Sequence, residues 1–137
     1  MSVPEPLRHK GRMEVHVKGQ YLASYTIKIL ANHNVFPPEV DTELVARIKN
    51  CAILMYTKLW SANKINAETN AVNREMRYTM QRAAWILCND MLAYIGIAKQ
   101  VFHLRNKRIQ YWGRLVSEEQ NLIQKWIESD VARYGKP

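Results

Sequence analysis

Three basic residues, Arg105, Lys107 and Arg108, lie where one predicted helix ends and the next begins. If Asn106 caps the second helix, Lys107 and Arg108 occupy its first turn, where each positive charge opposes the helix dipole by about 0.3 to 1 kcal/mol. The unpaired backbone amides of a helix start, together with two cationic side chains, suit a phosphate group. The pattern therefore predicts an anion site flanked by Arg105 and Arg114, whereas the alternative is a solvated charged corner.

A second basic group, Arg74, Arg77 and Arg82, lies earlier in the sequence, beside Tyr78. Residues three or four positions apart share one side of a helix, so these cations are expected on one broad face of it. Contacts with phosphates and occasional stacking on bases fit such a face. The sequence has no RNP motif, zinc finger or clear recognition helix, so it gives no support to the reading of specific bases.

Positive charge is concentrated in this part of the chain. The segment from Arg74 to Arg114 contains eight basic and two acidic residues, which makes it +6 of the formal charge of +8. Over all 137 residues, 20 lysines and arginines outnumber 12 aspartates and glutamates. Such an excess favours a polyanionic partner, and nucleic acid is the foremost of these.

The sequence offers little to a catalytic or metal site. No glutamate is followed three positions later by histidine, which is the spacing that di-iron bundles use. Gly-rich phosphate loops, Gly-x-Ser-x-Gly turns and a cysteine beside a base are also missing from the sequence. Cys51 and Cys88 lie in apolar patterns and are expected to be buried free thiols. We therefore expect no catalytic residue, no metal and no cofactor, hence a protein that is not an enzyme.

Apolar residues recur every three or four positions in four stretches, which indicates four helices. Short connections, no strand pattern and no repeated segment predict an all-α, up-down-up-down four-helix bundle. In the second helix Ile53, Leu54 and Trp60 lie outside the main apolar stripe, so either a second face is buried in an oligomer or the helix packs widely within one bundle. The expected helices span about residues 13–33, 42–63, 70–103 and 106–130.

The bundle is expected to cover residues 13–130. Residues 1–12, with two prolines and several basic residues, are expected to form a flexible basic N-terminal arm, or alternatively a merely frayed terminus. Residues 131–137 are expected to form a short C-terminal tail. The N-terminal residues lack the pattern of a signal peptide and no eighteen consecutive residues are apolar, so we expect a cytoplasmic protein that does not enter a membrane.

Several segments, in their order and spacing, resemble one known family. The resemblance is carried by Tyr25-Thr-Ile-Lys-Ile-Leu30, Asn34-Val-Phe-Pro37, Ala62-Asn63, Leu104-Arg-Asn-Lys-Arg-Ile-Gln-Tyr-Trp112 and Trp126-Ile-Glu-Ser-Asp130. The chain is similar over about residues 20–130 to the accessory variability determinant family. Its members are small four-helix-bundle proteins encoded beside the reverse transcriptase of diversity-generating retroelements in bacteria and their phages.

The resemblance implies a homopentameric barrel with a basic surface that binds RNA, and also DNA, and associates with the retroelement reverse transcriptase. It implies a non-catalytic accessory role in mutagenic retrohoming, in which template RNA-primed synthesis yields cDNA with adenine-directed errors. That cDNA then replaces a variable repeat in a target gene. On this chain the nucleic-acid role would fall on Arg74, Arg77, Arg105, Lys107 and Arg108, and the charge pattern adds Arg82 and Arg114.

Two alternatives stay open at this point. One is the type of four-helix bundle encoded in intervening sequences of bacterial 23S ribosomal RNA genes, which is similar in fold. The other is a helical interaction module that binds no nucleic acid. A reverse transcriptase gene and paired repeats beside this gene would separate the first from the retroelement role, and salt-dependent binding of nucleic acid would exclude the second.

Overall fold

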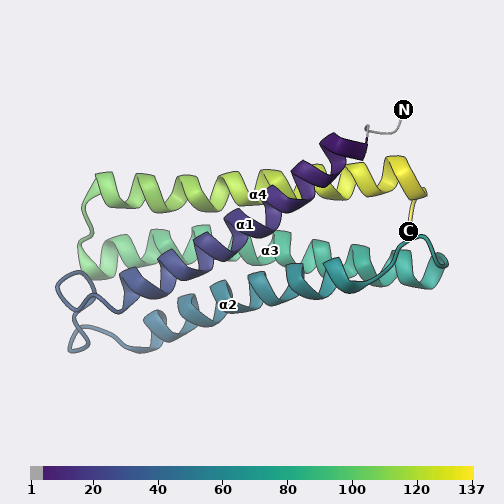
Figure 1. The fold of residues 1–137 in the computed structure, drawn as a ribbon. Helices are drawn as coiled ribbons and strands as arrows, with labels where there is room; N and C mark the ends of the chain where they lie inside the picture. The colour runs from purple at the N-terminus through teal and green to yellow at the C-terminus, as the bar shows by residue number, and fades with distance from the viewer. Residues whose placement is uncertain (1–4) are drawn as a thin grey trace.

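The computed structural model describes the backbone of residues 5–137 and the side chains of residues 14–137, and over this range the protein is a bundle of four α-helices (Figure 1). Each helix runs antiparallel to the next, and the contacts form a closed cycle in which α1 packs on α2, α2 on α3, α3 on α4 and α4 on α1. The predicted all-α four-helix bundle is confirmed for the described residues. The helices are α1 (Glu5–Leu30), α2 (Glu43–Lys64), α3 (Ala71–Phe102) and α4 (Asn106–Tyr134).

The helix ends follow local capping chemistry. The side chain of Asn70 accepts a hydrogen bond from the Asn73 amide at 2.8 Å, as expected of the cap of α3. At the other end of α3, His103 adopts a left-handed backbone with φ 52°, and the Leu104 amide donates to the Lys99 carbonyl at 3.2 Å. These bonds occupy backbone groups that the helix itself leaves unpaired.

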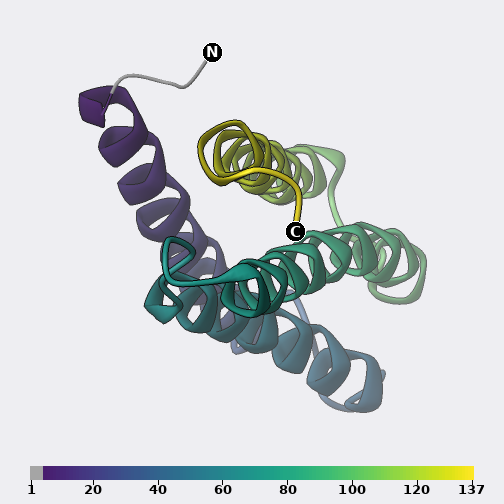
Figure 2. The ribbon, with the colours of Figure 1, turned by 90° about the vertical axis from the view of Figure 1, so that its right-hand side faces the viewer.

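The structure differs from the expected arm at the N-terminus. Helix α1 begins at Glu5, so residues 5–12 are helical rather than a flexible arm, while residues 1–4 lie outside the described residues. Pro6 is compatible with this start, because a proline in the first turn gives up an amide that would have no partner there. In Figure 2 the first turns of α1 diverge from α4, so this end of the helix leaves the bundle.

The predicted tail is also shorter than expected. Helix α4 continues past Asp130 to Tyr134, which leaves three residues after it. Gly135 stops the helix with a positive φ of 91°, and its amide donates to the Val131 carbonyl at 2.9 Å. Glycine adopts this conformation without the steric cost that a Cβ would bring.

Aromatic residues from different elements pack together in the core. Trp112 is fully buried, and its indole Nε1 donates to Thr26 Oγ1 at 3.1 Å, which joins α4 to α1. Phe36, in the connection between α1 and α2, packs edge-on against Phe102 with ring centroids 4.9 Å apart. Phe36 thereby closes one end of the bundle. None of the helices, over the residues described, is long and apolar enough to cross a membrane.

Both cysteines are buried free thiols, as predicted. Burial raises the pKa of Cys51 to about 11 and also raises the pKa of Cys88. The Cys51 thiol donates to the Leu87 carbonyl at 3.2 Å. Because the thiolate is the reactive form of cysteine, both side chains are inert packing groups near neutral pH.

One carboxyl group lies in the same core. Glu119 on α4 is 1% exposed, and neither of its oxygens has a hydrogen-bond partner among the described groups. Burial raises its pKa to about 9, Lys18 acts against this rise and Glu14 adds to it. Gly19 on α1 provides the space, because a Cβ there would lie 2.7 Å from Glu119 Oε2. Glu119 is therefore mainly protonated at neutral pH.

Replacing Glu119 with glutamine is expected to remove a pH dependence of stability. The folded-state pKa of about 9 exceeds the ordinary value of 4.5, so the contribution of Glu119 to stability is fully present below pH 4.5 and falls as the pH rises towards 9. The slope within this window is at most about 1.4 kcal/mol per pH unit. Urea unfolding should show Glu119→Gln close to wild type in acid and more stable than wild type at alkaline pH.

The neighbouring exposed glutamate provides the control. Glu118→Gln removes the same charge from the surface and should keep the wild-type slope of stability against pH. An unchanged slope in Glu119→Gln would show that Glu119 is ionised in the folded protein.

Candidate nucleic-acid interface

The predicted site residues fall into two groups at opposite ends of the bundle. Helix α3 runs the length of the molecule from the connection after α2 to the connection before α4 (Figure 1). Arg74 lies near its start and Arg105 follows its end, so at 1.5 Å per helical residue roughly 40 Å separates them. The two groups therefore cannot act as one compact site within a single chain.

At the α3–α4 end, Arg105, Lys107 and Arg108 form a cluster that we call the basic corner. Arg105 is the N-cap of α4, with an extended backbone and no capping side-chain bond, and Asn106 is the first helical residue. The expected cap at Asn106 is thus wrong by one position, but Lys107 and Arg108 do lie in the first turn. All three cations are exposed, and within residues 14–137 none of them forms an ion pair. The positive end of the helix dipole therefore meets uncompensated positive charge.

The basic corner borders a hollow between the α1–α2 and α3–α4 connections. Phe102 and Leu104 are its buried apolar members, whereas asparagine and arginine side chains reach solvent around them. Its volume of about 340 Å³ is ample for a phosphate group and its hydration. The residues that line the hollow are Asn32, Asn34, Val35, Phe102, His103, Leu104, Arg105 and Arg108.

Arg114 extends the positive charge along α4. It is exposed, and its guanidinium carbon lies 5.6 Å from the centre of the Tyr111 ring. Lys107, Tyr111 and Arg114 follow the spacing i, i+4 and i+7, so they share one face of the helix. Glu118, one turn further on, ends the positive run.

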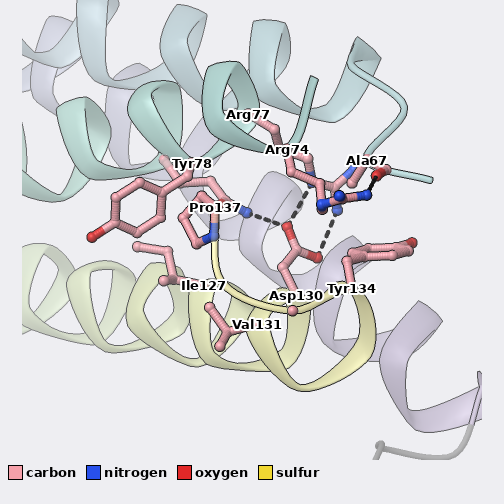
Figure 3. Close-up of a pocket in the computed structure, with 11 residues that line it drawn as sticks. Ala67, Arg74, Arg77, Tyr78, Ile127, Asp130, Val131, Tyr134 and Pro137 are labelled. Atoms are coloured by element: carbon pink, nitrogen blue, oxygen red, sulfur yellow. Dashed lines mark hydrogen bonds and ion pairs between the residues drawn. The ribbon is translucent and has the colours of Figure 1, made fainter. Parts of the chain in front are cut away.

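Arg77 does not belong to an exposed surface, which corrects the prediction made from its spacing. It is 5% exposed and donates two hydrogen bonds to the Asp130 carboxylate of α4, from Nε to Oδ2 at 2.6 Å and from Nη2 to Oδ1 at 2.9 Å (Figure 3). Its Nη1 also donates to the Ile65 carbonyl at 3.2 Å, and its guanidinium lies 5.0 Å from the centre of the Trp126 ring. The side chain joins three parts of the bundle and has a structural role.

The other two arginines of this group are only partly exposed. Arg74 donates to the Ala67 carbonyl at 3.4 Å beside the buried pair in Figure 3, and Arg82 lies with its guanidinium 5.0 Å from the centre of the Trp85 ring. The pocket between Arg74 and Asp130 has a volume of about 20 Å³, which is room for about one water molecule. This end of the bundle therefore offers less to a polyanion than the basic corner does.

Three tyrosines beside the basic corner were not assigned a role from the sequence. Tyr21 and Tyr25 follow the apolar periodicity of the first helix, yet Tyr21 is 50% exposed. Its hydroxyl lies 2.8 Å from the hydroxyl of Tyr111 on α4. The spacing of Tyr21, Tyr25 and Lys28 was the available signal, because it places two aromatic residues and a basic residue on one helical face.

Within the described residues, no group of three or more histidine, cysteine, aspartate or glutamate side chains is arranged to hold a metal ion. The chemistry that the basic corner can perform is the non-covalent binding of anions, since it presents cationic donors and backbone amides. Burial leaves Cys51, Cys88 and Glu119 without access to a substrate.

Replacing Asp130 with asparagine is expected to destabilise the bundle without a direct effect on the basic corner. The change keeps the shape of the side chain but leaves Arg77 buried without a counter-charge, which typically costs about 3 to 5 kcal/mol. Chemical unfolding measures this loss. The matched control is Glu68→Gln, which breaks the more exposed pair with Arg133 at 3.2 Å and should cost less than about 1 kcal/mol. Equal effects of the two changes would contradict the structural role of Arg77.

Comparison with known proteins identifies no relative of this chain. No protein-family model, curated protein or solved structure matches the chain. The function must therefore be argued from the exposed cations at the start of α4, the hollow beside them and the faces of the bundle that remain uncovered.

Proposed function

We propose that this chain is a non-catalytic nucleic-acid-binding accessory protein of a diversity-generating retroelement, acting beside its reverse transcriptase in the cytoplasm. The observation that carries the nucleic-acid role is the exposed basic corner, where cations occupy a helix start that local stability disfavours. An external polyanion removes this conflict. The resemblance of residues 20–130 to the accessory variability determinant family supports the retroelement assignment.

The phosphate backbone is the chemical group that the basic corner fits. The first amides of α4 lack partners within the helix, and Lys107 and Arg108 lie beside them in the same turn. Arg105 borders the hollow from the preceding connection. Cations and oriented amides bind phosphate oxygens without regard to sequence, so the protein would bind template RNA, and also DNA, at many positions.

Self-association is supported by an apolar stripe on the outer side of α3. At 3.6 residues per turn, its exposed members fall within an arc of about 80°, which is the width of a helix-packing seam. An uncovered seam of this length on a soluble bundle suits a second copy of the chain. The homopentamer itself is proposed from the family resemblance. The members of the stripe are Val72, Met76, Ile86, Ile97 and Val101. Helix α2 also exposes apolar side chains, which are Ile53, Leu54 and Trp60.

The basic corner is tested by the variant Arg105→Gln, Lys107→Gln, Arg108→Gln. Its affinity for RNA, measured by fluorescence anisotropy over a series of salt concentrations, should fall. The plot of log affinity against log salt should become less steep, its negative slope falling in magnitude by about 2 to 3. Each phosphate contact that is lost means that about one counterion fewer is released on binding. Circular dichroism should show an intact bundle, since all three side chains are exposed.

A control with the same net charge separates a local site from general electrostatics. The variant Lys49→Gln, Lys58→Gln, Lys125→Gln removes three cations from other surfaces and should keep most of the affinity. Equal losses in the two variants would contradict a specific role of the basic corner. No binding of RNA or DNA by the wild type at low ionic strength would overturn the nucleic-acid role and favour the interaction module.

The outer stripe of α3 is tested by Ile86→Glu combined with Ile97→Glu. Both side chains are about half exposed in the single chain, so the charges should be tolerated in the monomer but not in a buried seam between copies. Light scattering should show the wild type as a multiple of 16.0 kDa, five copies if the resemblance holds, and the variant as one copy. The control Val17→Glu with Val40→Glu places the same charges on other exposed apolar residues and should keep the wild-type mass.

The partner assignment has its own test. A reverse transcriptase should be encoded beside this gene and should co-purify with the protein. A gene located within a 23S ribosomal RNA operon, without a reverse transcriptase or paired repeats nearby, would favour the intervening-sequence alternative.

A further inference from the structure

Three tyrosine rings lie together on the outer side of the α1–α4 seam. Tyr21 and Tyr25 are one turn apart on α1, with ring centroids 6.3 Å apart and planes inclined by 29°. Tyr111 of α4 meets Tyr25 edge to face at 5.2 Å, and its hydroxyl lies 2.8 Å from that of Tyr21. Tyr21 is 50% exposed and the other two are half-buried. We call this cluster the tyrosine face.

Cations surround the tyrosine face. Arg114 lies over the Tyr111 ring at 5.6 Å, and Arg108 is close enough to Tyr25 to oppose the rise in the tyrosine pKa that burial causes. On α1, exposed Lys28 follows Tyr25 by three positions and so shares its face. Arg108 also lines the hollow at the end of the bundle. The tyrosine face and the basic corner are therefore parts of one continuous surface.

Packing alone does not require tyrosine at these positions. The inner side of the same seam is already filled by Trp112, which is fully buried and bonded to Thr26. The tyrosines lie outside this contact: Tyr25 packs against the edge of the core, whereas half of Tyr21 reaches solvent. Aromatic rings interleaved with cations are the surface on which proteins stack bases while tracking a phosphate backbone.

We infer that the tyrosine face binds the unpaired bases of single-stranded RNA or DNA, while the basic corner holds the adjoining phosphates. This inference rests on the proposed nucleic-acid role and narrows it to single strands. In a duplex the faces of the bases are covered by their neighbours, so a tyrosine ring can stack only on a base that is unpaired. The rings read no base edges, so stacking is tolerant of sequence.

The first test compares a single-stranded uridine oligonucleotide with duplex RNA of equal length. Tyr21→Leu keeps apolar bulk but removes the ring, and it should weaken single-strand binding by roughly fivefold to a hundredfold, which is the range that stacking on one ring covers. Duplex binding should change less than about twofold. Tyr21→Phe restores the ring without the hydroxyl and should bind single strands nearly as the wild type does.

The control is Tyr134→Leu. Tyr134 is also half-buried, with the guanidinium of Arg133 5.0 Å from its ring centre, but it lies at the end of α4, away from the basic corner. Single-strand affinity should be unchanged in this variant. A loss equal to that of Tyr21→Leu would show that any arginine-backed tyrosine on the surface contributes, and would overturn the assignment.

A photo-crosslink locates the contact independently of any variant. A single strand that carries 5-iodouridine should crosslink on irradiation to the tryptic peptides 19–28 and 109–114, which contain the tyrosine face. Crosslinks found only in other peptides would overturn the inference.

The outcomes separate the two proposals. If the wild type binds single strands and duplexes equally and Tyr21→Leu changes neither, the inference fails and the nucleic-acid role stands. If the wild type binds neither, both fail.

Discussion

The bond between Arg77 and Asp130 is the interaction on which one whole end of the bundle depends. It joins residues 53 positions apart through two short contacts, while the same guanidinium holds the Ile65 carbonyl after α2 and lies over Trp126. Gln81 adds a third donor to Asp130 at 2.8 Å. A buried ion pair adds little net stability compared with a well-packed apolar pair. It does favour one arrangement of α3 and α4, because any other arrangement would leave a buried charge without a partner.

The opposite end of the bundle also carries basic residues, but no described acid forms an ion pair with them. Arg105, Lys107 and Arg108 face no carboxylate among the described side chains, so their charges stay available to an external anion. Both groups have a similar basic pattern in the sequence, and only the presence of a facing acid distinguishes the buried arginine from the exposed ones. One end of α3 is therefore closed by an ion pair, and the other end carries the cations for which we propose a binding role.

Sequence periodicity predicted the four helices, because each depends on neighbours within a few positions. It failed at Arg77, whose partner is 53 positions away, and a helical repeat cannot show which face of α1 turns outward. Tyr21 follows the apolar periodicity of this helix although half of it is exposed. The basic corner was predictable because a cationic helix start breaks a local rule, whereas the tyrosine face needed the pairing of α1 with α4.

That pairing is set by the core rather than by the tyrosines. Gly19 lets α1 approach Glu119, and Thr26 accepts the Trp112 indole bond, so two inner contacts hold the α1–α4 seam on either side of Tyr21 and Tyr25 along α1. Protonated Glu119 allows the first of these contacts, since an ionised carboxylate in the same place would have no partner to offset its desolvation. With the seam fixed from inside, the outer rings are available for the base stacking that we propose.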